Sequence, residues 1–330
     1  MVSPAVSFII VNWNTKDLLR DCLESIRKTV RLPFEIWVVD NGSSDGSVRM
    51  VRERFPQVRL IQNSENLGFA RANNLALKRI SGKYAVLLNS DTVLKENAIA
   101  SLVECMEKNP RAGVCGGSLL NEDGSRQNSI ANFPTLATEL LNKSVLRRLF
   151  PKRFPGKENG ADNGVRLVES IVGACMVVRK KAMDGTGLLD EDYFFFLEET
   201  DWCLRFREKG WDVLHNPAAE IYHLQGGSAR KVPVRARTEY WRSRYIFFRK
   251  NRSRKAFALL KAGLVAKLAW SFVFLGLLNV ATLFLVKRLR SKLRLYAALL
   301  NWHFEGCPEA LGQRPEKAAR QKPREILKEA

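Results

Sequence analysis

Cysteine and histidine are scarce in this sequence, and neither is arranged as a metal centre would need. The 330 residues include six cysteines and three histidines. No two cysteines have the C-x-x-C spacing of a zinc or redox site, and several lie inside apolar runs, which is typical of buried, reduced thiols. No apolar leader precedes the first strand-like run, so we expect no signal peptide and a cytoplasmic location. A secreted disulfide protein and a structural zinc site are both disfavoured.

Acidic residues are scarce in the last third of the chain. Residues 229–330 contain 24 Lys and Arg, six Glu and no Asp, whereas residues 1–228 are nearly neutral, with 30 Lys and Arg against 28 Asp and Glu. A basic region of this kind binds anions, either nucleic acid or an anionic membrane surface. We therefore expect a globular part over residues 1–235 and a basic, helical C-terminal region over residues 236–330.

Charge is absent from the 19 residues Leu268–Val286. A helix of that length is about 30 Å long, just enough to cross the hydrocarbon core of a bilayer. Basic residues flank both ends, however, and the positive-inside rule disfavours a single span with such flanks. Beyond the run, Leu289, Leu293 and Leu300 recur at helical spacing among basic residues, as in an interfacial helix. We expect in-plane or re-entrant membrane attachment; a true span and a buried helix of a soluble dimer are the alternatives.

Short β-rich runs alternate with helical patterns over the first 120 residues. Strands are predicted at 6–11, 34–39, 58–61 and 84–88, and helices at 17–28, 48–55, 68–80 and 96–108. Residues 122–168 are expected to form loops with one helix near 136–149. Order is expected again at 171–178 and in a helix at 201–209.

Strands separated by crossover helices predict an α/β fold with a mostly parallel sheet and helices on both faces. In such sheets the ligand site lies outside the carboxyl ends of the strands. Polar clusters follow the predicted strands at that edge, at Asn12–Asn14, Asp40–Asp45, Asn63–Asn66 and Asn89–Asp91. The sequence therefore predicts one shared pocket there.

Asp40 ends the second predicted strand, where a Rossmann enzyme would bind the ribose of NAD. The turn after the first strand, Asn12–Thr15, contains no glycine, so the G-x-G-x-x-G fingerprint is missing and NAD binding is disfavoured. A carboxylate can instead accept a hydrogen bond from the N–H of a pyrimidine ring. The alternative is that Asp40 and Asp45 only organise a Gly-Ser turn and cap the next helix.

Asp91 follows the fourth predicted strand. One carboxylate is a weak site for a hard divalent cation, although diphosphate oxygens and water can supply further ligands. Its spacing alone favours a strand-end cap over a metal ligand. His223 precedes a Gly-Gly turn and is a candidate metal ligand or phosphate contact, although a lone histidine is more often neither.

Three carboxylates, Glu198, Glu199 and Asp201, follow an aromatic run at the start of a predicted helix. Acidic side chains stabilise a helix N-terminus, which is the simplest interpretation. Carboxylates crowded against an aromatic wall also have raised pKa values, which suits a general base. The spacing does not decide between these two roles.

Taken in order, these segments resemble the motifs of one enzyme family. They are similar to the family 2 inverting glycosyltransferases, in particular the branch of bacterial rhamnosyltransferases, in the stretches VSFIIVNWNTKDLLRDCLESI, VVDNGSSDGS, NLGFARANN, LLNSDTVL, GLLDEDYFFFLEETDWCLRFREKGW and HLQGGS. The likeness covers about residues 5–250. It implies a GT-A fold, with a nucleotide-sugar half over about residues 1–120 and an acceptor half over about residues 121–235.

The resemblance also implies the roles of single residues. Asp40 matches the aspartate that recognises the base, and Asp91 the last acid of the D-x-D motif, which binds Mg²⁺ or Mn²⁺ on the donor diphosphate. Glu199 matches the general base that deprotonates the acceptor hydroxyl, and His223 a histidine that can complete the metal site. Further donor-binding positions are Asn12, Asn66, Arg71, Asn89 and Ser90.

The sequence departs from the family pattern at two positions. The first D-x-D acid is Asn89, which we expect to be a neutral neighbour of the site and not a ligand. The E-D pair of the family reads Glu198-Glu199, so either carboxylate could be the base.

The implied function is sugar transfer from a nucleotide-sugar to a lipid-linked or saccharide acceptor in cell-surface polysaccharide synthesis, with dTDP-rhamnose as the donor suggested by the branch. The C-terminal region would hold the enzyme against anionic lipid at the cytoplasmic face of the inner membrane. Its uncharged run argues against nucleic acid as the partner. The other alternative, a nucleotidyltransferase, needs a Gly/Arg/Lys-rich loop, where residues 12–17 offer only Lys16. A homo-oligomer is left open.

Overall fold

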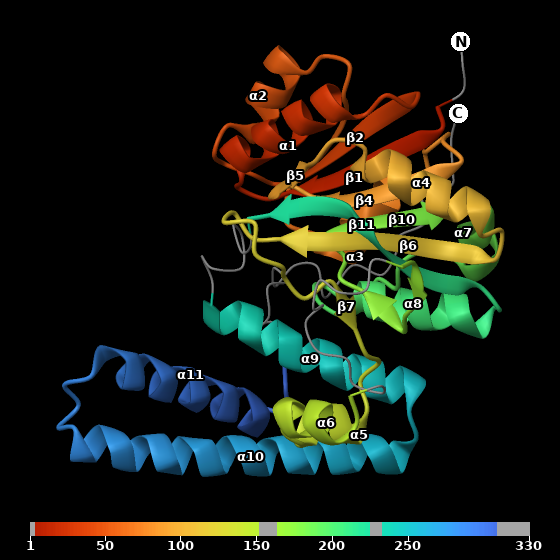
Figure 1. Ribbon diagram of the computed structural model, residues 1–330. Helices are drawn as coiled ribbons and strands as arrows, with labels where there is room; N and C mark the ends of the chain where they lie inside the picture. The colour runs from red at the N-terminus through yellow and green to blue at the C-terminus, as the bar shows by residue number, and fades with distance from the viewer. Residues whose placement is uncertain (1–3, 152–163, 225–232, 309–330) are drawn as a thin grey trace, which may run out of the picture.

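A computed structural model describes residues 4–151, 164–224 and 233–308 (Figure 1). The Gly226–Gly227 turn expected after His223, and the end of the basic region from residue 309, lie outside the described residues. The described chain forms an α/β domain with three further helices beneath it, as Figure 1 shows. All six cysteines are free, and five of them are buried.

A nine-stranded sheet forms the centre of the α/β domain, with the strand order β3-β2-β1-β4-β10-β6-β11-β5 and β8 paired to β11. β7 and β9 form a separate pair. The strands are β1 (Val6–Asn12), β2 (Phe34–Asn41), β3 (Arg59–Asn63), β4 (Tyr84–Asn89), β5 (Thr92–Leu94), β6 (Ala112–Leu120), β7 (Ile130–Ala131), β8 (Arg166–Leu167), β9 (Ser170–Ile171), β10 (Cys175–Arg179) and β11 (Asp212–His223).

The four predicted strands of the first half are confirmed, and β1 to β4 pair in parallel. β10 is inserted between β4 and β6 and is antiparallel to both. β6 and β11 are again parallel to each other, whereas β5 and β8 pair with β11 antiparallel. The sheet is thus parallel from β3 to β4 and mixed in the part formed by β10, β6, β11, β5 and β8.

Helices cover both faces of the sheet, as the alternating pattern predicts. One face packs against α1 (Lys16–Thr29), α2 (Ser47–Arg54) and α4 (Ala98–Lys108), through apolar residues such as Leu23 and Met106. The other face packs against α3 (Phe69–Leu77), α7 (Lys180–Thr186) and α8 (Glu198–Glu208). β1 contributes to both cores because its residues alternate between the faces: Phe8 and Ile10 point to the first core, and Ile9 to the second.

The single helix expected near 136–149 is wrong in detail, because the segment contains two helices, α5 (Leu136–Leu140) and α6 (Lys143–Leu149). Leu141 is extended, and the side chain of Asn142 accepts a hydrogen bond from Ser144 N and so starts α6 as a new helix. The segment therefore forms two short helices instead of one, because the extended Leu141 and the cap at Asn142 interrupt the helical backbone.

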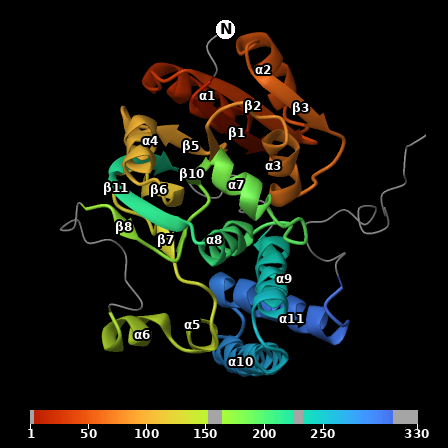
Figure 2. The ribbon, with the colours of Figure 1, turned by 90° about the vertical axis from the view of Figure 1, so that its right-hand side faces the viewer.

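Beneath the α/β domain lie α9 (Pro233–Asn251), α10 (Arg254–Ala281) and α11 (Lys287–Phe304), with α5 and α6 beside α10 (Figures 1 and 2). The three long helices share an apolar core that is separate from the two cores of the sheet. In that core Trp302 stacks on Tyr245, with ring centroids 6.1 Å apart. The boundary expected near residue 235 falls inside α9, which joins the α/β domain to the hairpin.

The uncharged run Leu268–Val286 is not one helix. α10 ends at Ala281, and the chain turns back through Leu283 and Phe284, both with left-handed backbone angles (φ +48° and +58°), into α11. Hence α10 and α11 form a hairpin, which we call the helical hairpin. By length and composition α10 is the one helix of the described residues long and apolar enough to cross a membrane, with a mean hydropathy of 1.8.

Candidate active site

A chain of hydrogen bonds joins the carboxyl ends of β2, β1 and β4. Asn12 at the end of β1 donates to Asp40 Oδ1 at the end of β2, over 2.9 Å. Thr15 donates to Asn12 Oδ1 over 2.7 Å, and its hydroxyl lies 2.8 Å from the hydroxyl of Ser90 beyond β4. All four side chains are buried. The predicted site residues Asn12, Asp40 and Ser90 therefore form one continuous polar edge, with Thr15 between them.

Asp40 has both carboxylate oxygens engaged. Asn12 donates to Oδ1, and the backbone N–H of Ser43 donates to Oδ2 over 2.9 Å. The Gly-Ser turn expected from the sequence is thus held by Asp40. A carboxylate has about four lone-pair sites, so two hydrogen bonds leave Asp40 capacity to accept another.

Asn66 and Arg71 lie farther along the same edge. Asn66 Oδ1 accepts hydrogen bonds from Gly68 N and from Asn41 Nδ2, over 2.9 and 3.2 Å. Arg71 on α3 lies 3.6 Å from a carboxylate oxygen of Glu191. Asn66 therefore shapes the turn before α3, and Arg71 ties α3 to the segment that leads to Glu198.

Asp91 and His223 face each other. The metal site implied by the family resemblance requires the two side chains to be close. Asp91 Oδ1 lies 3.4 Å from His223 Nε2, and their side chains are 12% and 13% exposed. β5 begins directly after Asp91 and pairs with the end of β11, where Thr92 is opposite His223. The backbone N–H of Leu224 donates to the carbonyl of Asp91. This short pairing holds two residues 132 positions apart in sequence at one point of the sheet edge.

Gln127 fixes the tautomer of His223. The Gln127 amide nitrogen lies within hydrogen-bond distance of three oxygens, Leu120 O, Asn121 Oδ1 and His223 O, which its two N–H groups share, so the amide oxygen is the atom that faces His223 Nδ1. That oxygen lies 3.0 Å from His223 Nδ1, which must carry the proton. In the neutral ring Nε2 then presents a lone pair to Asp91. Two acceptors face one another, an arrangement that suits a cation between them.

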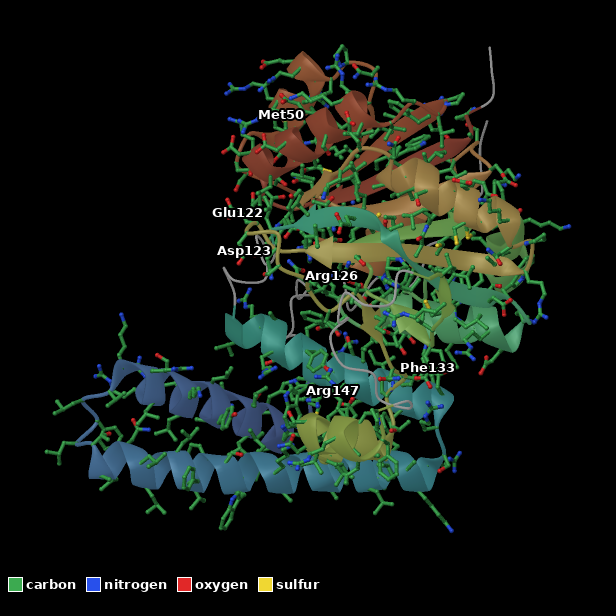
Figure 3. All side chains as sticks on the ribbon, in the orientation of Figure 1. Met50, Glu122, Asp123, Arg126, Phe133 and Arg147 are labelled. Atoms are coloured by element: carbon green, nitrogen blue, oxygen red, sulfur yellow. The ribbon has the colours of Figure 1, made fainter. Side chains whose placement is uncertain are left out.

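Gln127 belongs to the loop after β6, at the edge where β6 and β11 end. Figure 3 labels Glu122, Asp123 and Arg126 on this loop. We did not predict Gln127 as a site residue, because it lies in a stretch that reads only as polar loop. Its contact with His223 spans 96 positions, and no local spacing indicates it.

Glu198 and Glu199 begin α8. Glu198 is buried and Glu199 partly exposed, and no hydrogen-bond partner of Glu198 Oε2 lies among the described residues. Burial raises the pKa of Glu199 to about 7. Burial, and then the charge of Glu199, raise the pKa of Glu198 well above its ordinary value. Glu198 therefore holds its proton more strongly than an ordinary glutamate, and near neutral pH Glu199 is balanced between its two forms.

Asp201 is not part of the site. Its carboxylate accepts hydrogen bonds from Arg205, Asn251 and Tyr193, and it is buried. These contacts join α8 to the last residue of α9. Asp201 therefore has a structural role, as the alternative from sequence allowed.

A strained turn positions the two glutamates. Phe196 and Leu197, immediately before Glu198, have φ values of +72° and +65°, which non-glycine residues rarely adopt. α9 supports this turn: Ser243 donates to the carbonyl of Phe195, and the Phe196 ring packs edge-on against Tyr240. The turn is held by contacts from a helix about 40 residues later in the chain.

The segment before β10 links Glu199 to β4. The side chain of Glu199 lies against Gly173, where an added Cβ would be 3.3 Å from its Cβ and Cγ atoms. The next carbonyl, that of Ala174, accepts a hydrogen bond from Asn89 N over 2.9 Å. Glu199 is thereby tied, through two adjacent residues, to the strand end that carries Asp91.

A cavity of about 480 Å³ lies beside the glutamates. It is bounded by Leu197 and Thr200, which flank them, by Tyr240 of α9 and by residues of β7, β8, α5 and α6. Arg147 of α6, labelled in Figure 3, also lines it. Its size suits a small saccharide.

The family model for glycosyl transferase family 2 matches residues 7–185, more than half of the chain. The chain belongs to this family. It is a glycosyltransferase, and the resemblance read from the motifs is confirmed.

Two relatives show the similarity across most of this glycosyltransferase. The N-acetylglucosaminyl-diphospho-decaprenol L-rhamnosyltransferase of Mycobacterium tuberculosis is 26% identical over 253 residues, 72% of this chain and 82% of the relative. The O-antigen biosynthesis protein RfbC of Myxococcus xanthus is 24% identical over 244 residues, 73% of this chain and 19% of RfbC.

Solved structures confirm the GT-A fold. The mannosyltransferase PcManGT from Pyrobaculum calidifontis, in complex with GDP-Man and Mn²⁺, has a TM-score of 0.54 and 16% identity, over 92% of this chain and 87% of its own. GalNAc-T7 with UDP, GalNAc and Mn²⁺ has a TM-score of 0.52 and 16% identity, over 73% of this chain and 47% of its own.

A substitution at Gly68 tests whether the strained turn before Glu198 of this glycosyltransferase depends on close packing against Gly68. A Cβ at Gly68 would lie 2.5 Å from the carbonyl oxygen of Phe194, and its φ is +84°. We expect Gly68→Ala to displace the segment before Glu198, to cost about 2–4 kcal/mol of unfolding free energy and to lower transfer activity. Chemical denaturation measures the loss of unfolding free energy.

Gly46→Ala is the matched control. Gly46 has the same φ, and an added Cβ there would have no atom within 4 Å, so a loss of only about 1–2 kcal/mol is expected. Equal losses in the two variants would contradict the expectation.

Proposed function

We propose that this glycosyltransferase moves a sugar from a nucleotide-sugar donor to a lipid-linked saccharide by a single displacement with inversion. The observation that carries the proposal is the arrangement of two groups. The Asp91–His223 pair lies at the carboxyl ends of the strands, and Glu199 is tied to the same strand end beside the cavity. The similarity to a rhamnosyltransferase acting on a diphospho-decaprenol acceptor supports rhamnose and a lipid-linked acceptor.

The donor would lie across the polar edge of β1, β2 and β4. Asp40, with capacity to accept a further hydrogen bond, is placed to recognise the base. Asn12 and Ser90 belong to the hydrogen-bond chain that fixes this edge, whereas Asn66 and Arg71 shape its border. This placement agrees with the general position of ligands in open α/β sheets, outside the carboxyl ends of the strands.

The residues present fit a divalent cation, Mg²⁺ or Mn²⁺, held by Asp91 and His223. Ligands at about 2.1 Å from one ion and at right angles are about 3 Å apart, close to the 3.4 Å between Asp91 Oδ1 and His223 Nε2. Gln127 orients the histidine from its other nitrogen, as metal-bound histidines require. The described residues contain no group of three or more His, Cys, Asp or Glu side chains that could hold a metal. Donor phosphate oxygens and water would therefore complete the ligand set.

Glu199 is the better candidate for the general base. Burial and the charge of Glu199 raise the pKa of Glu198 well above its ordinary value, whereas the pKa of Glu199 is raised to about 7. Glu199 removes the proton of the acceptor hydroxyl, the oxygen attacks the anomeric carbon, and the bond to the nucleoside diphosphate breaks. A bound cation would supply charge stabilisation for the departing diphosphate.

A transfer assay with matched variants tests the proposed function. Incubating the full chain with dTDP-rhamnose or UDP-sugars, Mn²⁺ and a prenyl-diphosphate-linked GlcNAc acceptor should give product. Asp91→Asn should lower transfer at least about 100-fold and weaken Mn²⁺ binding measured by electron paramagnetic resonance, because it removes the charged ligand. The matched control Asn89→Asp, two residues away, should retain transfer. Wild-type rates no higher than those of Asp91→Ala, across all donors and acceptors, would refute the proposal.

The pH dependence of transfer tests the role of Glu199. Because a base acts only when deprotonated, kcat/KM should fall about tenfold per pH unit as the pH drops below about 7. Glu199→Gln should remove this acid limb and lower the rate at least about 100-fold. Glu198→Gln changes the carboxyl group that is not the proposed base, so the fall in kcat/KM at low pH should persist in this variant. If the fall in kcat/KM at low pH disappears in Glu198→Gln instead, the base is Glu198.

Membrane association of the helical hairpin is the second part of the proposal, at the cytoplasmic face of the inner membrane. On α10 large apolar side chains recur with helical spacing on one exposed stripe, at Trp270, Val273, Phe274, Leu277 and Val280. Leu141, Val145, Leu149 and Phe150 of the α5–α6 segment are also exposed, and Figure 2 shows α5 next to α10 with α6 beyond it. We call these residues the apolar face. The nearby helix α11 begins with basic residues, which favours anionic lipid.

Cell fractionation tests this second part. The full chain should sediment with membranes and remain there in high salt, because apolar contacts persist when charges are screened. Changing Trp270, Phe274 and Leu277 together to Gln should shift the protein to the soluble fraction. A triple change of exposed charged residues on α4, Glu104, Glu107 and Lys108, to Gln is the control and should leave the protein on membranes. Unaltered sedimentation of the α10 variant would exclude the apolar face as the anchor.

A further inference from the structure

A second cavity, of about 170 Å³, lies where α9, α10 and α11 meet α5. Its basic residues are Arg237 and Arg244 from α9 and Lys267 from α10. Tyr240 and Trp241 of α9, Ser271 of α10 and Tyr296 of α11 contribute further. The one carboxylate among its lining residues is Glu139. With three cations against one carboxylate, the cavity favours an anion.

Arg244 is the basic residue of this cavity whose position is fixed by its neighbours. Its side chain is 9% exposed, and its guanidinium lies 4.8 and 4.6 Å from the ring centres of Tyr240 and Trp241. One terminal nitrogen donates to Glu139 over 3.2 Å. Its Nε is buried and has no hydrogen-bond partner among the described residues. Arg244 is thus a nearly buried guanidinium in the lining of the cavity with one donor still unpaired, which favours an acceptor at this position.

Arg237 and Lys267 are exposed at the same cavity and belong to different helices. They can therefore bind an anion that enters from the surface. A diphosphate presents several acceptor oxygens and matches two guanidinium groups and one ammonium group. The volume, enough for about a dozen water-sized groups, accommodates such a group.

The position of the cavity decides which kind of diphosphate it would hold. Glu139 and Tyr240 line both this cavity and the larger one beside Glu198 and Glu199. On its other side Lys267 lies one helical turn from Trp270, the first residue of the exposed stripe of α10. From the glutamates outward, the order is a saccharide-sized cavity, a basic cavity and an apolar stripe. A saccharide, a diphosphate and a prenyl chain follow one another in the same order in a lipid-linked acceptor.

We infer that the cavity formed by Arg237, Arg244 and Lys267 binds the diphosphate of a prenyl-diphosphate-linked acceptor. The inference rests on the proposed function for the acceptor class. The saccharide then extends toward Glu199, and the prenyl chain leaves along the stripe that starts at Trp270. The cavity would thereby set the distance between the membrane and the reacting hydroxyl.

The test is equilibrium binding of radiolabelled farnesyl diphosphate to the detergent-solubilised full chain, without nucleotide sugar. Arg237→Gln combined with Lys267→Gln should weaken binding about tenfold or more, the loss of two charge-assisted contacts at an exposed site. Both side chains are exposed, so the fold should persist. The control combines Arg249→Gln and Lys261→Gln, which removes one exposed cation from each of the same two helices outside the cavity. It should bind as the wild type does.

Competition in the same assay identifies the group that is recognised. Inorganic pyrophosphate should compete and farnesol should not. Equal binding by the two double variants would overturn the inference. So would competition by farnesol or by phosphatidylglycerol that is as strong as competition by unlabelled farnesyl diphosphate. In transfer assays the Arg237/Lys267 variant should raise KM for the lipid acceptor and leave KM for the nucleotide sugar unchanged. If no donor supports transfer but the Arg237/Lys267 variant still binds farnesyl diphosphate more weakly than the control variant, the proposed function is wrong and the diphosphate site is supported.

Discussion

The hydrogen-bond chain from Asp40 through Asn12 and Thr15 to Ser90 is the constraint on which the proposed donor site at the sheet edge depends. Parallel strands bring polar residues to one edge, but they do not fix the side chains. Here each side chain is held by the next, so the ends of β2, β1 and β4 act as one unit. Because the chain is buried, breaking one bond leaves an unpaired polar group, which costs about 1–3 kcal/mol. That cost keeps the edge in a single arrangement before any donor arrives.

The second half of the site is held by different means. Glu199 depends on a backbone turn through Phe196 and Leu197 that neither residue favours by itself. The contacts from Ser243 and Tyr240 offset that unfavourable geometry. α9 is also part of the core of the helical hairpin. One helix thus connects the proposed base with the proposed membrane anchor.

Much of the α/β domain could be predicted from sequence, because its strands are buried on both faces and read as continuous apolar runs. The roles proposed for Asp91, His223 and Glu199 were predicted from the ordered motifs. Spacing alone favoured a cap for Asp91 and no role for the histidine, and it did not decide the role of Glu199. Thr15 and Gln127 were not found. Thr15 reads as an ordinary residue before a helix, and Gln127 gains its partner only when β11 returns next to the loop after β6.

The end of α10 illustrates a further limit. The turn at Leu283 and Phe284 contains no glycine or proline, so the uncharged run predicted one continuous segment instead of a hairpin. The left-handed turn at Leu197 escaped notice for the same reason. In both places packing in the folded chain, and not local preference, determines the backbone.

The support of the Phe196–Leu197 turn by α9 has a consequence for the order of events during synthesis. The family match ends at residue 185, and β11, the last strand of the sheet, ends at His223. A chain emerging from the ribosome can therefore assemble its whole sheet before α9 has been made. The base-bearing turn would gain its support only as the residues leading to the hairpin appear. Catalytic competence would then begin late in translation, close to the moment when the protein can reach a membrane.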